Sequence, residues 1–402
     1  MLFRSKYKQI FPATNPDGTK ISPDESVLVN RAVQGNYNLG STIKPFIAWA
    51  AMHNGLLKSD TVFMDKGTYT LYSIKPNDCL PRGIAKCIFK NAANPRTNQP
   101  SAYGPVTVED ALAVSSDAFF YKLGEDFYVK SRTLLKTSLE QFGFGTKTGV
   151  QLPFEWAGRV PDSAVKKALV EKGVLAKNEK PRLLVGDNVQ VAIGQGLMAA
   201  TPLQLADAYA SIANGGNLLV PGIVRAIWAP LTPDLKPAVA DLRRGRILQR
   251  FDHAVLRGKL EMPPEVLMPI VAGLHRVTHG PGVDWVFHHY TTGEQLFKGM
   301  PISVAGKTGT AQGMGSLPWN DSSVFGAFSE DKRWPYTVVS YLEKSGFGAK
   351  AAAPVTKCVF LAISHQVKTD PVQVSNPLNL FRSEEHTSEL QSHLNLVCRL
   401  LL

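Results

Sequence analysis

The pattern of apolar and polar positions predicts a helix that begins directly after residue 40. Gly40 and Ser41 open the segment, Pro45 lies in its first turn, and Asn54 precedes the glycine that ends it; such residues mark helix starts and stops. Apolar side chains lie on nearly every face, so the helix is expected to be buried. Ser41 and Lys44 lie at the N-terminal end of this buried helix, which suggests a functional site there.

The same patterns predict further helices and a group of late strands. A helix is expected over residues 108–124, and another runs from Thr201 as cap and Pro202 as first residue to Ala213. Strand patterns concentrate late in the chain, over residues 302–311, 323–328 and 336–342, and a helix over 351–363 follows them.

One globular domain is expected over residues 1–370, followed by a non-globular tail over 371–402. No internal repeat divides the domain, but residues 56–105 are rich in loops. From about Phe381 the composition changes sharply, and the segment resembles the translated sequencing-adapter tail that recurs in metagenomic reading frames. A native helical tail is the alternative; we expect the artefact, and the segment does not enter the fold prediction.

Composition places the chain among ordinary globular proteins. Of its 402 residues, 44% are apolar and 19% are charged, which excludes collagen-like, fibrous and wholly disordered classes. The formal net charge of +11 suits an anionic partner such as a lipid surface or a cell wall. Basic residues are scattered without interleaved aromatic residues, so no nucleic-acid partner is expected, and a solvated basic surface is the simpler interpretation.

The sequence carries no sign of a membrane span or a disulfide scaffold. No run of about 18 apolar residues occurs, and residues 1–20 lack the apolar core of a signal peptide. Four cysteines are too few for a disulfide framework. Cys79 and Cys87 either pair across a short loop or remain two thiols.

The first candidate for chemistry is the S-x-x-K segment formed by Ser41 and Lys44. Three helical residues place both side chains on one face, one turn apart. A serine hydroxyl needs a nearby base to become a useful nucleophile, and a lysine whose pKa burial has lowered can act as that base. The motif alone is common by chance, and an ordinary helix start would be the interpretation if nothing else matched.

Two further motifs add polar residues to apolar surroundings. Ser115 and Asp117, in the triplet 115–117, interrupt the apolar run of the predicted helix over 108–124, where polar groups need a reason; a break in the helix is the alternative.

Lys307, Thr308 and Gly309 lie within a strand pattern whose glycines allow a ligand backbone to approach closely. A second K-T-G, at residues 147–149, lies in a glycine-rich turn and is expected to be a decoy.

The order S-x-x-K, S-x-D, K-T-G matches the motif set of penicillin-binding proteins and β-lactamases. The segments 30–46, 189–216 and 319–325 resemble the corresponding parts of class B penicillin-binding proteins, the last of them those of elongation-type members. The resemblance covers residues 25–370. It implies an α+β, serine β-lactamase/D,D-transpeptidase-like fold, with an antiparallel sheet flanked by helices and an all-helical subdomain. Asp117 stands where many members carry Asn, and residues 56–105 look enlarged.

The resemblance also implies a reaction, namely D,D-transpeptidation of peptidoglycan without a cofactor. Ser41 would attack the carbonyl between the terminal D-alanines of a stem peptide, and Lys44 would take its proton. Ser115 would relay a proton to the leaving amine, and Asp117 would fix the lysine and the substrate amide. The substrate-binding residues would be Lys307, Thr308, Gly309 and Thr310. Lys307, Thr308 and Thr310 would hold the terminal carboxylate, and the backbone N–H groups of Ser41 and Thr310 would form the oxyanion hole.

Other interpretations share the motifs. A β-lactamase is less expected because no Glu-x-x-Leu-Asn element follows Ser115 at a suitable distance, and a D,D-carboxypeptidase is a similar minority interpretation. A β-lactam sensor or a catalytically dead penicillin-binding domain is the alternative from another class. A metal site is not expected: His275 and His279 have helical metal spacing but no evident third ligand.

The resemblance finally predicts a context for the chain. Family members carry a membrane anchor and work with a RodA-like glycosyltransferase of the elongation machinery, at the extracytoplasmic face of the bacterial cytoplasmic membrane. Neither an anchor nor a pedestal domain is evident here, so a fragment of a longer product is expected. Residues 1–40 show no pair of period-two strands, and the three late strands are therefore expected to form a sheet incomplete on its N-terminal side.

Overall fold

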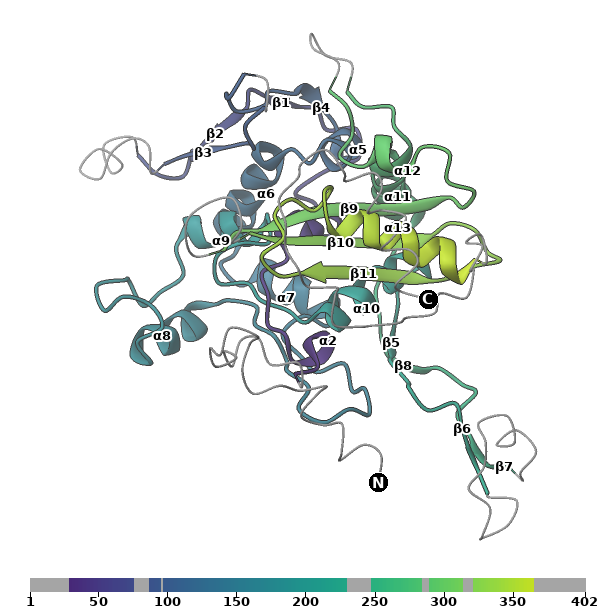
Figure 1. The fold of residues 1–402 in the computed structure, drawn as a ribbon. Coiled ribbons are helices and arrows are strands. Elements are labelled where there is room, and N and C mark those ends of the chain that lie inside the picture. Colours follow the sequence, from purple (N-terminus) through teal and green to yellow (C-terminus); the bar gives the residue numbers. More distant parts are fainter. Residues whose placement is uncertain are drawn as a thin grey trace, which may run out of the picture.

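A three-stranded antiparallel sheet lies at the centre of the computed structural model, which describes residues 29–75, 87–94, 97–229, 247–283, 289–313 and 321–364 (Figure 1). Its order is β11 (Thr337–Leu342), β10 (Ser322–Ser329) and β9 (Val304–Ala311). In this register Thr308 lies opposite Phe325, and Gly309 lies opposite Val324. The predicted late strands are therefore confirmed.

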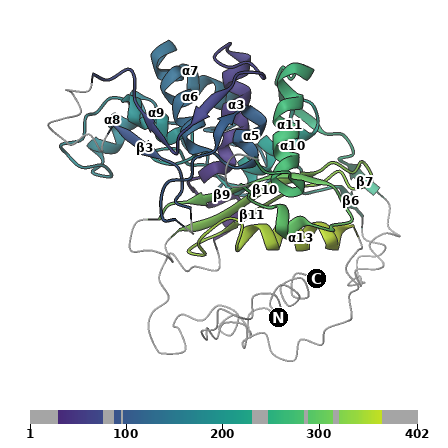
Figure 2. The ribbon, with the colours of Figure 1, turned by 90° about the horizontal axis from the view of Figure 1, so that it is seen from above.

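Helices cover both faces of this sheet, which explains why its strands are apolar and glycine-rich rather than alternating. Helix α13 (Ala352–Ile363) packs on one face, and α10 (Pro202–Ala213) and α11 (Pro264–His279) lie on the other (Figure 2). The expected cap of α10 is present, because the Thr201 side chain accepts a hydrogen bond from the backbone N–H of Gln204. Antiparallel strands with helices on both faces confirm the expected α+β class.

The helix predicted from its apolar residues forms the centre of the helical layer. It begins as the 3₁₀ turn η2 (Gly40–Ile43), continues as α3 (Lys44–His53), and buries every residue from position 44 to 51. Phe46 packs on Phe142, Phe144 and Tyr209 with ring centroids 4.8, 5.3 and 5.2 Å apart. The predicted burial is confirmed.

The helix predicted over residues 108–124 is wrong as one continuous element. The chain instead forms α5 (Val108–Ala113) and α6 (Asp117–Lys130), with Ser115 at φ +62° between them. The physical reason is local: the Ser116 side chain accepts a hydrogen bond from the Phe119 N–H and so caps a new helix. The polar triplet is a helix break, which was the alternative interpretation.

Residues 56–105 form short strands that pack beside α6. β1 (Phe63–Asp65) pairs with β4 (Gly104–Val106), and β2 (Thr68–Thr70) pairs with β3 (Ile88–Lys90). The buried Glu125 carboxylate on α6 accepts hydrogen bonds from the Tyr69 hydroxyl and from the backbone N–H groups of Tyr72 and Ser73. The enlarged segment is thereby fixed to the helix that follows the second motif.

The remaining elements surround these layers. They are α2 (Arg31–Gln34), α7 (Leu134–Gln141), α8 (Ser163–Glu171), α9 (Val185–Val191), β5 (Asn217–Val220), β6 (Ala226–Trp228), β7 (Ile247–Arg250), β8 (Val255–Lys259) and α12 (Glu294–Phe297). Among the residues that the structure describes, no helix combines the length and apolarity that crossing a bilayer requires.

Several predictions fall outside the described residues. Residues 1–28, on which the predicted incompleteness of the sheet depends, and the tail from residue 365 are not described. Cys87 is disulfide-bonded, but Cys79 also lies outside the described ranges, so their pairing stays a prediction.

Gly326 offers a test of how α10 holds the sheet. A Cβ at this position would lie 2.5 Å from the ring of the fully buried Tyr209, so Gly326→Ala is expected to lower the free energy of unfolding by about 1–3 kcal/mol through overpacking. Urea unfolding measures the change. Gly222→Ala is the control, because a Cβ there meets no atom within 4 Å; equal stability of the two variants would contradict this packing.

Candidate active site

Ser41 lies where the segment formed by η2 and α3 meets β9, at the edge of the sheet. It belongs to the turn η2, which leads directly into α3 at Lys44. The preceding Gly40 donates its N–H to the Gly194 carbonyl at 2.9 Å and adopts φ +52°. A Cβ on Gly40 would lie 2.5 Å from the carbonyl oxygen and 2.8 Å from the nitrogen of Thr310. Glycine therefore allows the backbone beside Ser41 to touch the backbone of β9.

Lys44 is the central charged group of the site and is fully buried. Its Nζ lies 2.6 Å from Asp117 Oδ1 and donates to the carbonyl oxygen and Oγ of Ser115 at 2.8 and 3.2 Å. Burial lowers the pKa of Lys44, and the charge of Asp117 opposes this shift. The amine therefore gives up its proton more readily than an exposed lysine, while its position is fixed by three acceptors.

The break between α5 and α6 places Ser115 and Asp117, of the second motif, in contact with Lys44. With Ser115 at φ +62°, both its carbonyl oxygen and its hydroxyl face Nζ of Lys44. Asp117 is the first residue of α6. Left-handed backbone at a residue other than glycine is uncommon and strained, and such strain often accompanies functional sites.

Lys307, on β9, is the second fully buried lysine of the site. Burial and the nearby ammonium group of Lys44 hold the pKa of Lys307 well below its usual value, while Asp117 opposes the shift. Its Nζ donates to the carbonyl of Thr308 at 3.3 Å. A bound anion would add negative charge beside this pair of lysines, whose lowered pKa values Asp117 opposes.

The remaining residues of the third motif are held from three sides. The Thr308 hydroxyl donates to Oγ1 of Thr292 at 2.8 Å. The Thr310 carbonyl accepts a hydrogen bond from Gln195 Nε2 at 2.8 Å, and the Gln195 Oε1 accepts from the N–H of Gln312 at 3.2 Å. A Cβ on Gly309 would lie 2.8 Å from the Leu39 carbonyl, so this strand also passes the segment before Ser41 without room for a side chain.

The structure thus brings the first and third motifs into backbone contact and joins Lys44 to Ser115 and Asp117. Gln195 lies in the resembling segment 189–216, but its role as a bridge to β9 was not predicted. The sequence signal for it is an amide between two glycines, Gly194 and Gly196, both of which adopt positive φ in the structure.

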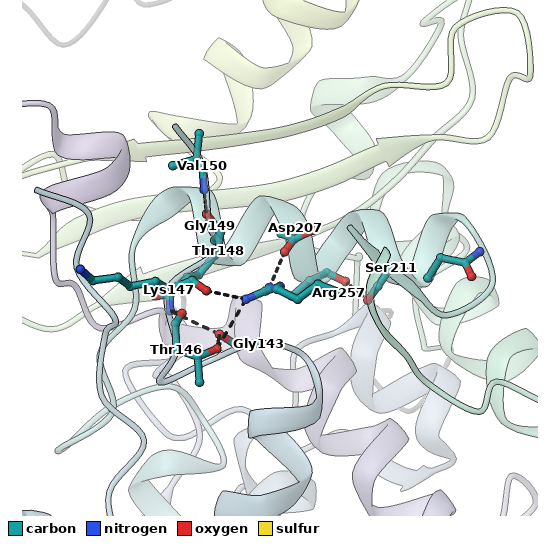
Figure 3. A network of polar contacts seen from close by, with 12 residues as sticks. Gly143, Thr146, Lys147, Thr148, Gly149, Val150, Asp207, Ser211 and Arg257 are labelled. Atoms are coloured by element: carbon teal, nitrogen blue, oxygen red, sulfur yellow. Dashed lines mark hydrogen bonds and ion pairs between the residues drawn. The ribbon is translucent and has the colours of Figure 1, made fainter. Parts of the chain in front are cut away.

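The second K-T-G is a decoy, as expected. Lys147 is exposed, and its carbonyl accepts a hydrogen bond from Arg257, which also pairs with Asp207 at 2.6 Å (Figure 3). The backbone N–H of Thr148 donates to the Glu155 carboxylate at 2.6 Å. These contacts make the segment a structural turn.

A second S-x-x-K spacing also occurs, at Ser163 and Lys166 on α8. Although burial alone lowers the pKa of Lys166, its pairing with Asp187 and Glu179 at 2.8 and 3.0 Å raises it overall. The pKa of Lys166 is therefore raised whereas that of Lys44 is lowered, and the Lys166 side chain joins α8 to Asp187 on α9.

A buried carboxylate that the sequence did not single out supports the second motif. Asp65, at the end of β1, accepts hydrogen bonds from the Ser116 hydroxyl at 2.5 Å, from Asn91 Nδ2 at 2.9 Å and from the Gly67 N–H at 2.7 Å. Asn91 Oδ1 in turn accepts from the N–H of Ala118 at 2.7 Å. The 56–105 segment, whose role was open, therefore clamps the residues on both sides of Asp117.

The prediction that no third ligand accompanies His275 and His279 is wrong. The carboxylate of Glu330 lies beside both rings, and ligand atoms of the three residues are within 4.8 Å of one another. Glu330 follows β10 and is 55 residues away from His275 in the sequence, so no local spacing could have revealed it.

The chain matches known proteins over most of its length. The family profile described as "Penicillin binding protein transpeptidase domain" matches residues 6–82 and 85–361. A Haemophilus influenzae protein named peptidoglycan D,D-transpeptidase MrdA is 29% identical over 345 residues, which are 83% of this chain and 45% of the relative. The chain thus spans about half the length of this curated relative.

Solved structures share the fold. A structure of Pseudomonas aeruginosa PBP2 in complex with WCK 5153 has a TM-score of 0.61 at 23% identity and covers 89% of this chain and 70% of that one. A complex between PBP2 and MreC from Helicobacter pylori has a TM-score of 0.59 at 22% identity, covering 87% and 54%. These similarities confirm the expected β-lactamase/D,D-transpeptidase-like fold.

The electrostatics of Lys44 predict a pH dependence. If its neutral amine is the base, acylation by penicillin should rise with pH through the pKa of Lys44, which burial places below the usual value. Because the charge of Asp117 raises this pKa, Asp117→Asn is expected to move the rising limb to lower pH. Rates measured across the pH range test this, and a limb that stays in place or moves to higher pH would contradict the coupling.

The Asp65 cluster predicts a loss of both stability and reactivity. Asp65→Ala removes the buried acceptor of the Ser116 hydroxyl and one of the two acceptors of Asn91 Nδ2, and is expected to cost about 1–3 kcal/mol of unfolding free energy. Acylation measured well below the melting temperature should fall at least tenfold because Asp117 loses its support, and Asp65→Asn, which keeps one acceptor, should recover part of the rate. The exposed Asp60→Ala is the matched control; normal acylation by the Asp65 variant would exclude the positioning role.

Proposed function

The chain belongs to the penicillin-binding protein transpeptidase family, and we propose from this premise that it is a peptidoglycan D,D-transpeptidase with Ser41 as nucleophile. The observation that carries the proposal is the buried Lys44, with a lowered pKa and fixed by Ser115 and Asp117, one helical turn from Ser41. The name of the Haemophilus influenzae relative, a peptidoglycan D,D-transpeptidase, supports the same reaction.

In the proposed reaction Lys44 takes the proton of the Ser41 hydroxyl while the oxygen attacks the carbonyl carbon between two D-alanine residues. The C–N bond then breaks, and Ser115, hydrogen-bonded to Lys44 at 3.2 Å, passes a proton to the leaving amine. Backbone N–H groups of Ser41 and Thr310 bind the oxyanion; the contact between the Gly40 and Thr310 backbones supports this placement. An acceptor amine finally attacks the acyl-enzyme and releases Ser41.

The third motif supplies the binding site for the terminal carboxylate of the stem peptide. Lys307 contributes positive charge beside Lys44, and the hydroxyls of Thr308 and Thr310 add hydrogen bonds. The buried, glycine-containing strand β9 leaves its backbone open to close approach at Gly309. A β-lactam, which carries a carboxylate beside a reactive amide, would use the same groups.

The whole protein is proposed to act at the extracytoplasmic face of the bacterial cytoplasmic membrane, together with a RodA-like glycosyltransferase and the elongation machinery. The complex between PBP2 and MreC from Helicobacter pylori shows a protein of this fold with a partner protein, which supports this part of the proposal. The net charge of +11 suits an anionic cell wall.

Covalent labelling tests the nucleophile. Ser41→Ala is expected to abolish labelling by fluorescent penicillin because the acyl bond has no oxygen to form on, and Lys44→Ala should suppress it by removing the base. Ser163→Ala, which alters the other S-x-x-K on a described helix, is the matched control and should label normally. Circular dichroism checks that all three variants fold, and persistent labelling of the Ser41 variant would refute the assignment.

A chase and a substrate assay then separate the competing functions. A stable penicillin adduct excludes a fast β-lactamase. Transfer of a D-Ala-D-Ala stem peptide to an acceptor amine supports the transpeptidase, whereas release to water alone indicates a carboxypeptidase. Labelling without any turnover of the peptide would indicate a sensor or a catalytically dead domain.

A further inference from the structure

The C-terminal turn of α11 carries two histidines that face a carboxylate from the sheet. His275 and His279 are one helical turn apart, and their rings stack with centroids 4.0 Å apart and an interplanar angle of 1°. Nδ1 of His275 lies 2.8 Å from Oε2 of Glu330, directly after β10. We propose that His275, His279 and Glu330 bind a zinc ion, at a site separate from the proposed catalytic residues.

Hydrogen bonds from neighbouring residues orient the side chains of this cluster, as hydrogen bonds to metal-binding side chains do. Nδ1 of His279 lies 2.9 Å from the Thr278 hydroxyl and 3.2 Å from the carbonyl oxygen of His275. A carbonyl accepts only, so this contact favours the tautomer with a proton on Nδ1 and leaves Nε2 to bind a metal. The Ser303 hydroxyl donates to Oε2 of Glu330 at 2.5 Å, which fixes the carboxylate.

The donor set favours zinc. Two imidazole nitrogens and one carboxylate oxygen form a His₂Glu set, which binds Zn²⁺ with a water in the fourth position. The ligand atoms lie within 4.8 Å of one another, so small side-chain rotations bring them to metal-bonding distance. His279 is exposed and the other two residues are partly buried, which leaves the site open to an ion from solvent.

An ion at this position would tie α11 to the sheet. Ser303 directly precedes β9, and the Thr278 hydroxyl on α11 already donates to the carbonyl of Val304, the first residue of that strand. The same helix is joined to α5 by the pair of Arg276 and Asp110 at 2.7 Å. Because a ligand that binds only the folded state stabilises it, bound zinc is expected to raise the melting temperature.

Zinc titration of the full chain, freed of metal by a chelator, tests the proposal. Wild-type protein is expected to bind one Zn²⁺ at this site in competition with a chromophoric chelator and to melt at a higher temperature with zinc. His279→Ala and Glu330→Gln should each weaken this binding at least tenfold and remove the melting shift. The exposed His253→Ala is the matched histidine control and should bind as the wild type does.

Two outcomes would overturn the site. Zinc binding and a melting shift that survive in a His275→Ala, His279→Ala double variant would place the metal elsewhere on the chain. Wild-type binding no tighter than that of the double variant would show that the cluster is only a hydrogen-bonded pair. Urea unfolding of each variant without zinc checks that the variants fold, so that lost binding reports the ligands.

Discussion

The burial of Lys44 is the constraint on which the rest of the site depends. An ammonium group removed from water is costly unless charge and hydrogen bonds replace its hydration. Asp117 and two oxygens of Ser115 supply this replacement at 2.6 to 3.2 Å, and the chain must break a helix to bring them there. The break needs its own support, which Ser116 gives as a helix cap and Asp65 gives by holding Ser116. The need to stabilise buried Lys44 thus accounts for the strained backbone at Ser115 and for the position of the Asp65 carboxylate, which comes from the 56–105 segment.

Local patterns predicted the elements whose cause is local. The apolar faces of the helix after Ser41, the cap at Thr201 and the late strands each depend on residues close together in the sequence, and the structure confirms them. The broken helix was missed because its apolar run continues across the triplet; the Ser116 cap is local, but the contacts of Ser115 with Lys44 and of Ser116 with Asp65 are tertiary. Asp65 and Glu330 were missed for a related reason, since each acts on residues about 50 positions away.

The repeated motifs show that surroundings, rather than spacing, decide the chemistry. Lys44 and Lys166 both follow a serine by three residues and both are buried, but burial lowers the pKa of Lys44 while two carboxylates raise that of Lys166. The two K-T-G triplets differ in the same way. Residues 307–309 lie in the buried strand β9, whereas residues 147–149 lie in a turn held by Arg257 and Glu155. The balance between burial and nearby carboxylates therefore sets the direction in which the pKa of each lysine shifts.

Side-chain charges and backbone contacts have different roles in this site. The side chains of Lys44, Asp117 and Lys307 are the charged groups of the site, and burial lowers the pKa of both lysines. Position is set instead by backbone contacts at glycines: a Cβ on Gly194 would lie 2.1 Å from the Gly40 carbonyl, and one on Gly348 would lie 2.4 Å from that of Gly309. No side chain fits at these contacts, so main-chain packing holds the segment around Ser41 against its neighbours. Changes at the charges should therefore alter rates in a folded protein, whereas changes at these glycines should disturb the fold and the site together.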